Sequence, residues 1–183
     1  LFQTEPTVSR AAFNRYVYAL NLPLRYPDVR SVSYAHRVPA SAKAEYERQL
    51  RRDPELVRRG YGNVVIKPAG ERSEYIVLTY VEPLHANKAA LGYDIASDKQ
   101  RVAPVERARD TGMPTLSGRV ILAADPTLSE TAVVMRLALY RKDAFVPDVE
   151  RRRQAFIGLA IVTFVVDELA QRMMSGEGYE KFT

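Results

Sequence analysis

The stretch from Leu91 to Leu122 constrains the fold more than any other part of the chain. An acidic residue, Asp94, stands where a short extended segment ends. Charged residues with helical spacing follow over 98–110, and Thr111-Gly112 supplies the stop, because glycine adopts the left-handed conformation that ends helices. Apolar residues then return over 118–123. The stretch therefore predicts a strand-end acid, a charged helix and a tight turn that leads back into a strand.

The rest of the chain alternates between helical and extended patterns. The expected elements are a helix over 7–20, a strand over 29–38, a helix over 41–52 capped by Ser41, a short helix from Asp53, strands over 64–67 and 75–81 forming a hairpin, helical turns over 84–91, the helix over 98–110, strands over 118–123 and 131–140, a helix over 147–154, a strand over 156–165 and a closing helix over 167–174. Pro104 either kinks the 98–110 helix or marks the start of its regular part. Strands mostly follow one another directly, which favours an antiparallel sheet over a parallel one. The predicted fold class is α+β, with a PAS-like antiparallel sheet flanked by helices and a stalk-like helix at the N-terminus.

The N-terminal helix is amphipathic. Phe13, Tyr16, Val17 and Leu20 have the i, i+3, i+4, i+7 spacing of one helix face, and Pro23 ends the pattern. This apolar face suits two arrangements, a stalk rising from a membrane or a helix packed on the sheet.

Composition excludes several classes of protein. With 46% hydrophobic and 27% charged residues among 183, the chain is expected to fold as a globular protein. The absence of cysteine excludes disulfides and thiolate metal sites. No apolar run approaches the roughly 18 residues of a membrane span. The net charge of +5 comes from basic residues interspersed with acids, which indicates a solvated basic surface, and we expect no nucleic-acid partner.

The stretch 91–122 resembles the signature of CHASE domains, which are extracytoplasmic sensors of receptor kinases and cyclases. Further similar segments occur in the same order along the chain: 13–20, 25–27, 33–39, 74–75, 80–83, 133–141 and 158–169. The resemblance implies a small-molecule-sensing domain of a membrane-bound bacterial receptor. The signalling enzyme, a diguanylate cyclase or a histidine kinase, would lie elsewhere in a longer chain, and this domain would not be an enzyme.

The resemblance also implies a binding site. In the plant cytokinin receptors of this family, one aspartate and backbone groups after the Thr-Gly turn hold a purine ring, and the corresponding positions here are Asp94 and Leu116. The expected ligand-binding residues are Asp94, Leu116, Tyr93, Tyr80, Tyr75 and Thr115, and the expected ligand is a small, purine-like molecule. Asp94 could instead cap the following helix, but Ser97 and Asp98 lie closer to its start and would leave Asp94 available. The pocket is expected between the strands 75–81, 116–122 and 133–140.

Other candidate residues point to no further chemistry. Arg136 could meet a carboxylate ligand if it faced inward, but a solvated arginine is expected on a strand. His36 and His85 lack the partners of a metal site, and no nucleophile or phosphate-binding motif occurs. We therefore expect no catalytic residue, metal or cofactor.

The expected organisation is a stalk helix over 1–24, a PAS-like CHASE sensor over 25–174 and the start of a membrane-proximal part over 175–183. Because Leu1 is not an initiator methionine, the sequence is expected to be a segment of a longer protein. That protein would hold the domain in the periplasm through transmembrane helices outside this sequence, and it could form a homodimer. Two alternatives remain open, a ligand-free dimerisation and signal-transmission module and a basic nucleic-acid binder.

Overall fold

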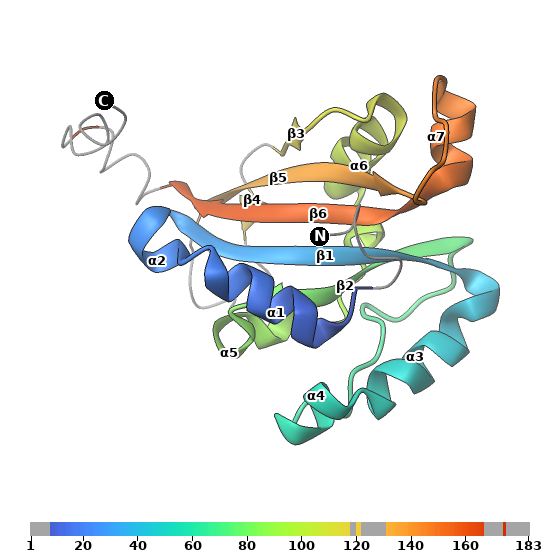
Figure 1. Cartoon of the computed structure of the whole chain (residues 1–183). Coiled ribbons are helices and arrows are strands. Elements are labelled where there is room, and N and C mark those ends of the chain that lie inside the picture. Colours follow the sequence, from blue (N-terminus) through green and yellow to red (C-terminus); the bar gives the residue numbers. More distant parts are fainter. Residues whose placement is uncertain (1–7, 118–119, 122–130, 167–173, 175–183) are drawn as a thin grey trace.

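A computed structural model describes residues 8–117, 120–121, 131–166 and 174. Within these residues, six strands form one antiparallel sheet in the order β2-β1-β6-β5-β3, and β4 also pairs with β5 (Figure 1). The strands are β1 (Val29–Pro39), β2 (Glu74–Glu82), β3 (Thr115–Leu116), β4 (Val120–Ile121), β5 (Thr131–Tyr140) and β6 (Phe156–Val165). The predicted α+β class and the PAS-like antiparallel sheet with flanking helices are confirmed.

The helices lie close to the predicted ranges. They are α1 (Arg10–Ala19), α2 (Leu22–Arg25), α3 (Lys43–Arg52), α4 (Pro54–Arg58), α5 (Leu84–Asn87), α6 (Lys99–Thr111) and α7 (Val149–Ala155), with 3-10 turns η1 (Ala40–Ala42), η2 (Lys88–Ala90) and η3 (Ile95–Ser97). The short helix expected from Asp53 is α4, and Asp53 caps it, because its Oδ1 accepts from the backbone N–H of Glu55 at 2.9 Å. Ser41 is not a cap, since it lies within η1 and α3 begins without a side-chain cap. Helix α6 continues through Pro104 and does not begin at it.

The central strand β1 shows how the sheet is covered on both faces. Successive side chains of a strand point to opposite faces, so Tyr34 and Ala35 face opposite ways. Tyr34 packs in a cluster with Phe13 of α1, whereas Ala35 packs in a cluster with Ala108 of α6. Helices α1 and α6 therefore lie on opposite faces of the sheet (Figure 1).

Helix α1 packs on the sheet along its described length. Phe13 and Val17 are buried, and the Phe13 ring lies 5.4 Å from the ring of Tyr80 in β2. Arg10 is also buried, and its Nε lies 2.7 Å from Oδ2 of Asp53. Tyr16 was expected on the buried face but is 46% exposed, because the contact with the sheet is narrower than the apolar stripe.

The predicted hairpin of 64–67 with 75–81 is wrong. The segment Gly92–Asp94 lies between them, with the Lys67 N–H donating to the Gly92 carbonyl at 3.0 Å and the Asp94 N–H donating to the Lys67 carbonyl at 2.7 Å. On its other side, the Leu78 N–H donates to the Tyr93 carbonyl and the Gly92 N–H to the Leu78 carbonyl, both at 2.9 Å. A segment distant in sequence therefore takes the edge of β2 that the hairpin would have used.

Strand β2 contains a bulge at Thr79. Tyr34 of β1 is opposite Tyr80, and the next residue, Ala35, is opposite Leu78, so Thr79 has no partner in the register. As a result, Leu78 and Val81 both face the α6 side of the sheet.

Some expected features lie outside the described residues. These are most of the helix over 167–174, the segment 175–183 and the parts of the strand over 118–123 that flank β4. The division of the chain at residues 24 and 174 stays a prediction.

Candidate ligand-binding site

A cavity of about 80 Å³ lies between the sheet and the segments that cover its α6 face. Its walls come from β1, β2, β5 and β6 on the sheet side, and from the α5–η2 segment, Tyr93, η3 and α6 on the other. The polar lining residues are Ser31, Ser33, Asn87, Arg101, Arg136 and Thr163. A mostly apolar wall with a few placed polar groups is typical of a small-molecule site.

Strand alternation places the polar side chains in the cavity. Ser31 and Ser33 of β1 point to the same face, as do Val134 and Arg136 of β5 and Ile161 and Thr163 of β6. The sequence analysis expected a pocket between β2, the 116–122 strand and β5. The cavity is bordered by β2 and β5 as expected, but β1 and β6 line it in place of the 116–122 strand, because they occupy the centre of the sheet.

Of the six predicted binding residues, only Tyr93 lines this cavity. The guanidinium of Arg101 lies over its ring, 5.2 Å from the centroid. Tyr93 is therefore a wall of the site and also places a cationic group beside it.

Asp94 has a structural position next to the cavity. Its side chain is completely buried, and Oδ1 accepts from the backbone N–H groups of Ile76 at 2.9 Å and of Ala96 at 3.0 Å. The second of these bonds caps η3, so the expectation that Ser97 and Asp98 would leave Asp94 free is wrong. A separate 3-10 turn precedes α6, and Asp94 is its nearest acceptor.

The second carboxylate oxygen of Asp94 is less well satisfied. Oδ2 accepts no hydrogen bond among the described residues and lies 3.5 Å from Nε of Arg72. Burial raises the pKa of Asp94 above its ordinary value, against the lowering effect of the two backbone hydrogen bonds and of Arg72. Asp94 therefore holds the Tyr93 segment against β2 without facing the cavity.

The remaining predicted residues lie elsewhere. Tyr75 and Tyr80 each donate their hydroxyl to a backbone carbonyl, at 3.1 Å and 2.8 Å. Thr115 donates to the Pro104 carbonyl at 3.1 Å, which ties β3 to α6, and Leu116 is 64% exposed on the sheet edge. The structure does not bring these four residues together with the cavity, and their binding role stays a prediction.

Arg136 is the site residue that sequence reasoning placed wrongly. It was expected to face solvent, but it is 2% exposed and lines the cavity. Its Nη1 donates to the Val134 carbonyl at 3.3 Å, and its Nε has no hydrogen-bond partner among the described residues. Burial lowers the pKa of Arg136 to about 10, with a further contribution from the charge of Arg101.

The cavity has a positive electrostatic character. Arg101 pairs with Asp98, whose Oδ2 lies 3.1 Å from its Nε, and none of the described residues that line the cavity is acidic. No ion pair joins Arg136 to a carboxylate within the described part of the chain. The charge of Arg101 is therefore balanced by Asp98, whereas no described carboxylate balances the charge of Arg136.

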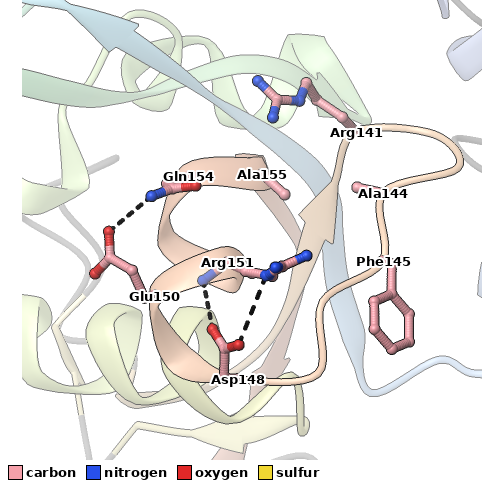
Figure 2. A pocket seen from close by; sticks show the side chains of 8 residues that line it. All are labelled: Arg141, Ala144, Phe145, Asp148, Glu150, Arg151, Gln154 and Ala155. Carbon is pink, nitrogen blue, oxygen red and sulfur yellow. Dashed lines mark hydrogen bonds and ion pairs between the residues drawn. The ribbon is translucent and has the colours of Figure 1, made fainter.

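A wider groove of about 610 Å³ runs along α7 and the preceding loop (Figure 2). Its two acids are engaged within α7 and its cap, since Asp148 pairs with Arg151 at 3.8 Å and Glu150 accepts from Gln154 at 3.0 Å. Figure 2 shows the Arg141 guanidinium pointing away from these pairs. This groove is open and its lining residues are mostly exposed, so the enclosed cavity is the better ligand site.

The described residues contain neither a metal cluster nor a membrane-spanning helix. No group of three or more histidine, aspartate or glutamate side chains there could hold a metal ion. No described helix has the length and apolar character needed to cross a membrane.

The fold and the enclosed cavity are those of a PAS-like sensor domain. The family model of the CHASE domain matches residues 6–182, which is nearly the whole sequence. The chain therefore belongs to the CHASE domain family, and the resemblance noted in the sequence is confirmed. This family consists of extracytoplasmic, non-catalytic sensor domains of signalling receptors that bind small ligands. A search of curated proteins finds no match to the chain.

Proposed function

We propose that this domain senses a small molecule for a membrane-bound bacterial receptor, with the ligand held in the cavity between the sheet and α6. The attached enzyme would be a diguanylate cyclase or a histidine kinase, and the domain would lie in the periplasm. The observation that carries the proposal is an enclosed cavity with buried polar groups at the interface of sheet and helices, in a chain of the CHASE family.

Strand β1 offers a route from the cavity to the N-terminal helix. Ser33 lines the cavity, and its neighbour Tyr34 packs against α1 on the other face. A ligand that binds one arrangement of β1 more tightly than another would shift the population of the domain, and α1 would move with it. The shift cannot exceed the difference in ligand affinity between the two arrangements.

The cavity favours a ligand smaller than a substituted purine. Its volume of about 80 Å³ is well below the roughly 300–1,000 Å³ of pockets for drug-sized molecules. A purine would require α6 and η3 to move away from the sheet, whereas a molecule of a few heavy atoms fits the present arrangement.

The test is a thermal-melting screen of small molecules, because a ligand of the native state must raise the melting temperature. Ser33→Leu, which fills the cavity, should abolish the rise that the wild type shows. Thr163→Val gives a milder change at the same cavity. The matched control is Ser41→Leu, since Ser41 is exposed and outside the cavity.

The role of Asp94 is tested in the same assay. We propose that it supports the Tyr93 segment, and the sequence also predicts a direct contact with the ligand. If Asp94→Ala binds the ligand within about tenfold of the wild type, or ~1.4 kcal/mol, then Asp94 is not the anchor.

The small cavity also favours a second candidate, a ligand-free dimerisation and transmission module. In that case no compound would raise the melting temperature, and Ser33→Leu would leave signalling by the full receptor unchanged. Mass spectrometry of small molecules that co-purify with the domain, together with sedimentation of the domain, separates the two candidates.

A further inference from the structure

We propose that the cavity binds a short organic carboxylate and that Arg136 is the residue that holds its anionic end. The inference rests on the proposed sensing function and specifies the chemistry of the ligand. The family match assigns no role to Arg136, and the sequence favoured a solvated arginine over one that faces inward to meet a carboxylate.

A buried guanidinium requires a partner. Arginine is almost never fully buried unless it is paired, because moving its charge out of water is costly. Arg136 is 2% exposed, yet among the described residues it makes one hydrogen bond of 3.3 Å, to a neutral carbonyl of its own strand. Its Nε donates to nothing in this part of the chain. An anion in the cavity would supply the missing acceptor.

The charges around the cavity indicate a ligand with one negative charge. Two guanidinium groups line it, those of Arg101 and Arg136. Asp98 neutralises Arg101 at 3.1 Å, and the part of the lining that the structure describes contains no acid that could neutralise Arg136. The planar guanidinium can donate two parallel hydrogen bonds to a carboxylate, a stronger arrangement than a bond to a neutral acceptor.

The remaining walls indicate what the carboxylate is attached to. Leu78, Val81 and Ile161 provide apolar contact for a short carbon chain. The hydroxyls of Ser31 and Ser33 are positioned in the same cavity and could bind a hydroxyl or oxo group of the ligand. Among the described lining residues no carboxylate could bind an ammonium group, so an uncharged substituent fits better than an amino group. Short-chain hydroxy and oxo acids have this combination of features.

The experiment measures binding of acetate, lactate and pyruvate to the 183-residue chain by calorimetry and thermal melting. Lactamide and inorganic phosphate serve as comparison ligands. Arg136→Met removes the charge and keeps much of the apolar volume, and Arg141→Met is the matched control at an exposed arginine outside the cavity. We expect at least one of the acids to bind the wild type at least tenfold more tightly than lactamide or phosphate. Arg136→Met should lose at least tenfold of that affinity, and the control should lose none.

The variant has a second readout that needs no ligand. Because Arg136→Met removes an unpaired buried charge, the ligand-free variant should melt at a temperature equal to or above that of the wild type. A lower melting temperature, with acid affinity retained within twofold, would overturn the inference.

The other outcomes separate the inference from the proposed function. If lactamide binds as tightly as lactate and Ser33→Leu abolishes the binding of both compounds, the cavity is a ligand site but its ligand need not be a carboxylate. If phosphate binds more tightly than the acids, the inference that the ligand is a carboxylate is likewise overturned. If none of the acids binds, the inference fails, and the wider screen described above then decides the proposed function.

Discussion

Gly92 and Gly60 provide a test of how the Gly92–Asp94 segment is held. Both glycines have a left-handed backbone conformation, with φ of 79° and 80°. They differ in their surroundings. A Cβ at Gly92 would overlap the backbone carbonyl oxygen of Val65 and lie 2.9 Å from Cγ1 of Val64, whereas a Cβ at Gly60 would meet nothing within 4 Å. Replacing each by alanine therefore separates backbone strain from steric overlap.

The expected costs follow from these two contributions. A non-glycine residue in the left-handed region costs about 1–2 kcal/mol, which applies to both Gly60→Ala and Gly92→Ala. Gly92→Ala should lose a further ~1–3 kcal/mol, because the backbone of Val65 has to move and it belongs to the segment that Gly92 itself binds. For a chain of this size, that difference corresponds to roughly 2–4 °C of melting temperature per kcal/mol.

Urea unfolding at 25 °C gives the free energy of unfolding for both variants and the wild type. Circular dichroism of the native proteins shows whether the fold is retained. If the two variants lose the same stability within about 0.5 kcal/mol, the close packing of Gly92 against the 64–67 segment is refuted.

Three further predictions concern two buried charged residues, Asp94 and Arg10. Asp94→Ala should lose about 2–4 kcal/mol in urea unfolding, because it leaves the N–H groups of Ile76 and Ala96 without an acceptor, and a loss below 1 kcal/mol would contradict that role. Burial raises the pKa of Asp94, so the native state binds its proton more tightly than the unfolded state does. The stability of the wild type relative to Asp94→Asn should therefore rise as the pH falls from neutrality through the raised pKa towards about 4, and a difference that does not change with pH would contradict it. Arg10→Ala should lose about 2–3 kcal/mol, since it removes the 2.7 Å ion pair with Asp53 and leaves that carboxylate unpaired, and a stability equal to the wild type's would count against the pairing.

Local sequence patterns were sufficient for most of the fold. Neighbouring residues determine the helix at 98–110, the strands at 29–38 and 156–165 and the short helix from Asp53, and each lies close to where its pattern indicated. The hairpin prediction failed because the partner of Lys67 is Gly92, which is distant in sequence. The alternation and turn residues of one segment do not show that a distant segment will pair with it instead of its neighbour in the sequence.

The site was less predictable for a related reason. In β5 both sets of alternating side chains are apolar, with Val134 and Ala138 on one face and Leu137 and Leu139 on the other. The pattern therefore did not show that Arg136 points to the buried face. The family resemblance predicted a ligand-binding role for Asp94, which stays a prediction. Its hydrogen bonds to backbone groups were not predicted, because they depend on how β2 and η3 meet, which only the structure shows.

The bulge at Thr79 adds one residue to β2 that pairs with no residue of β1 and contacts two helices instead. Its carbonyl accepts from Arg10 at 2.8 Å and its hydroxyl lies 2.5 Å from that of Tyr46, so α1 and α3 are both anchored at the irregular position. Deleting this single amino acid would restore regular pairing, with Tyr80 still opposite Tyr34 and Val81 still opposite Ser33, so both side chains would keep their faces. The deletion would remove the attachment point of both helices and leave the lining of the cavity from β2 in place, so helix anchoring and ligand specificity can change independently at this strand.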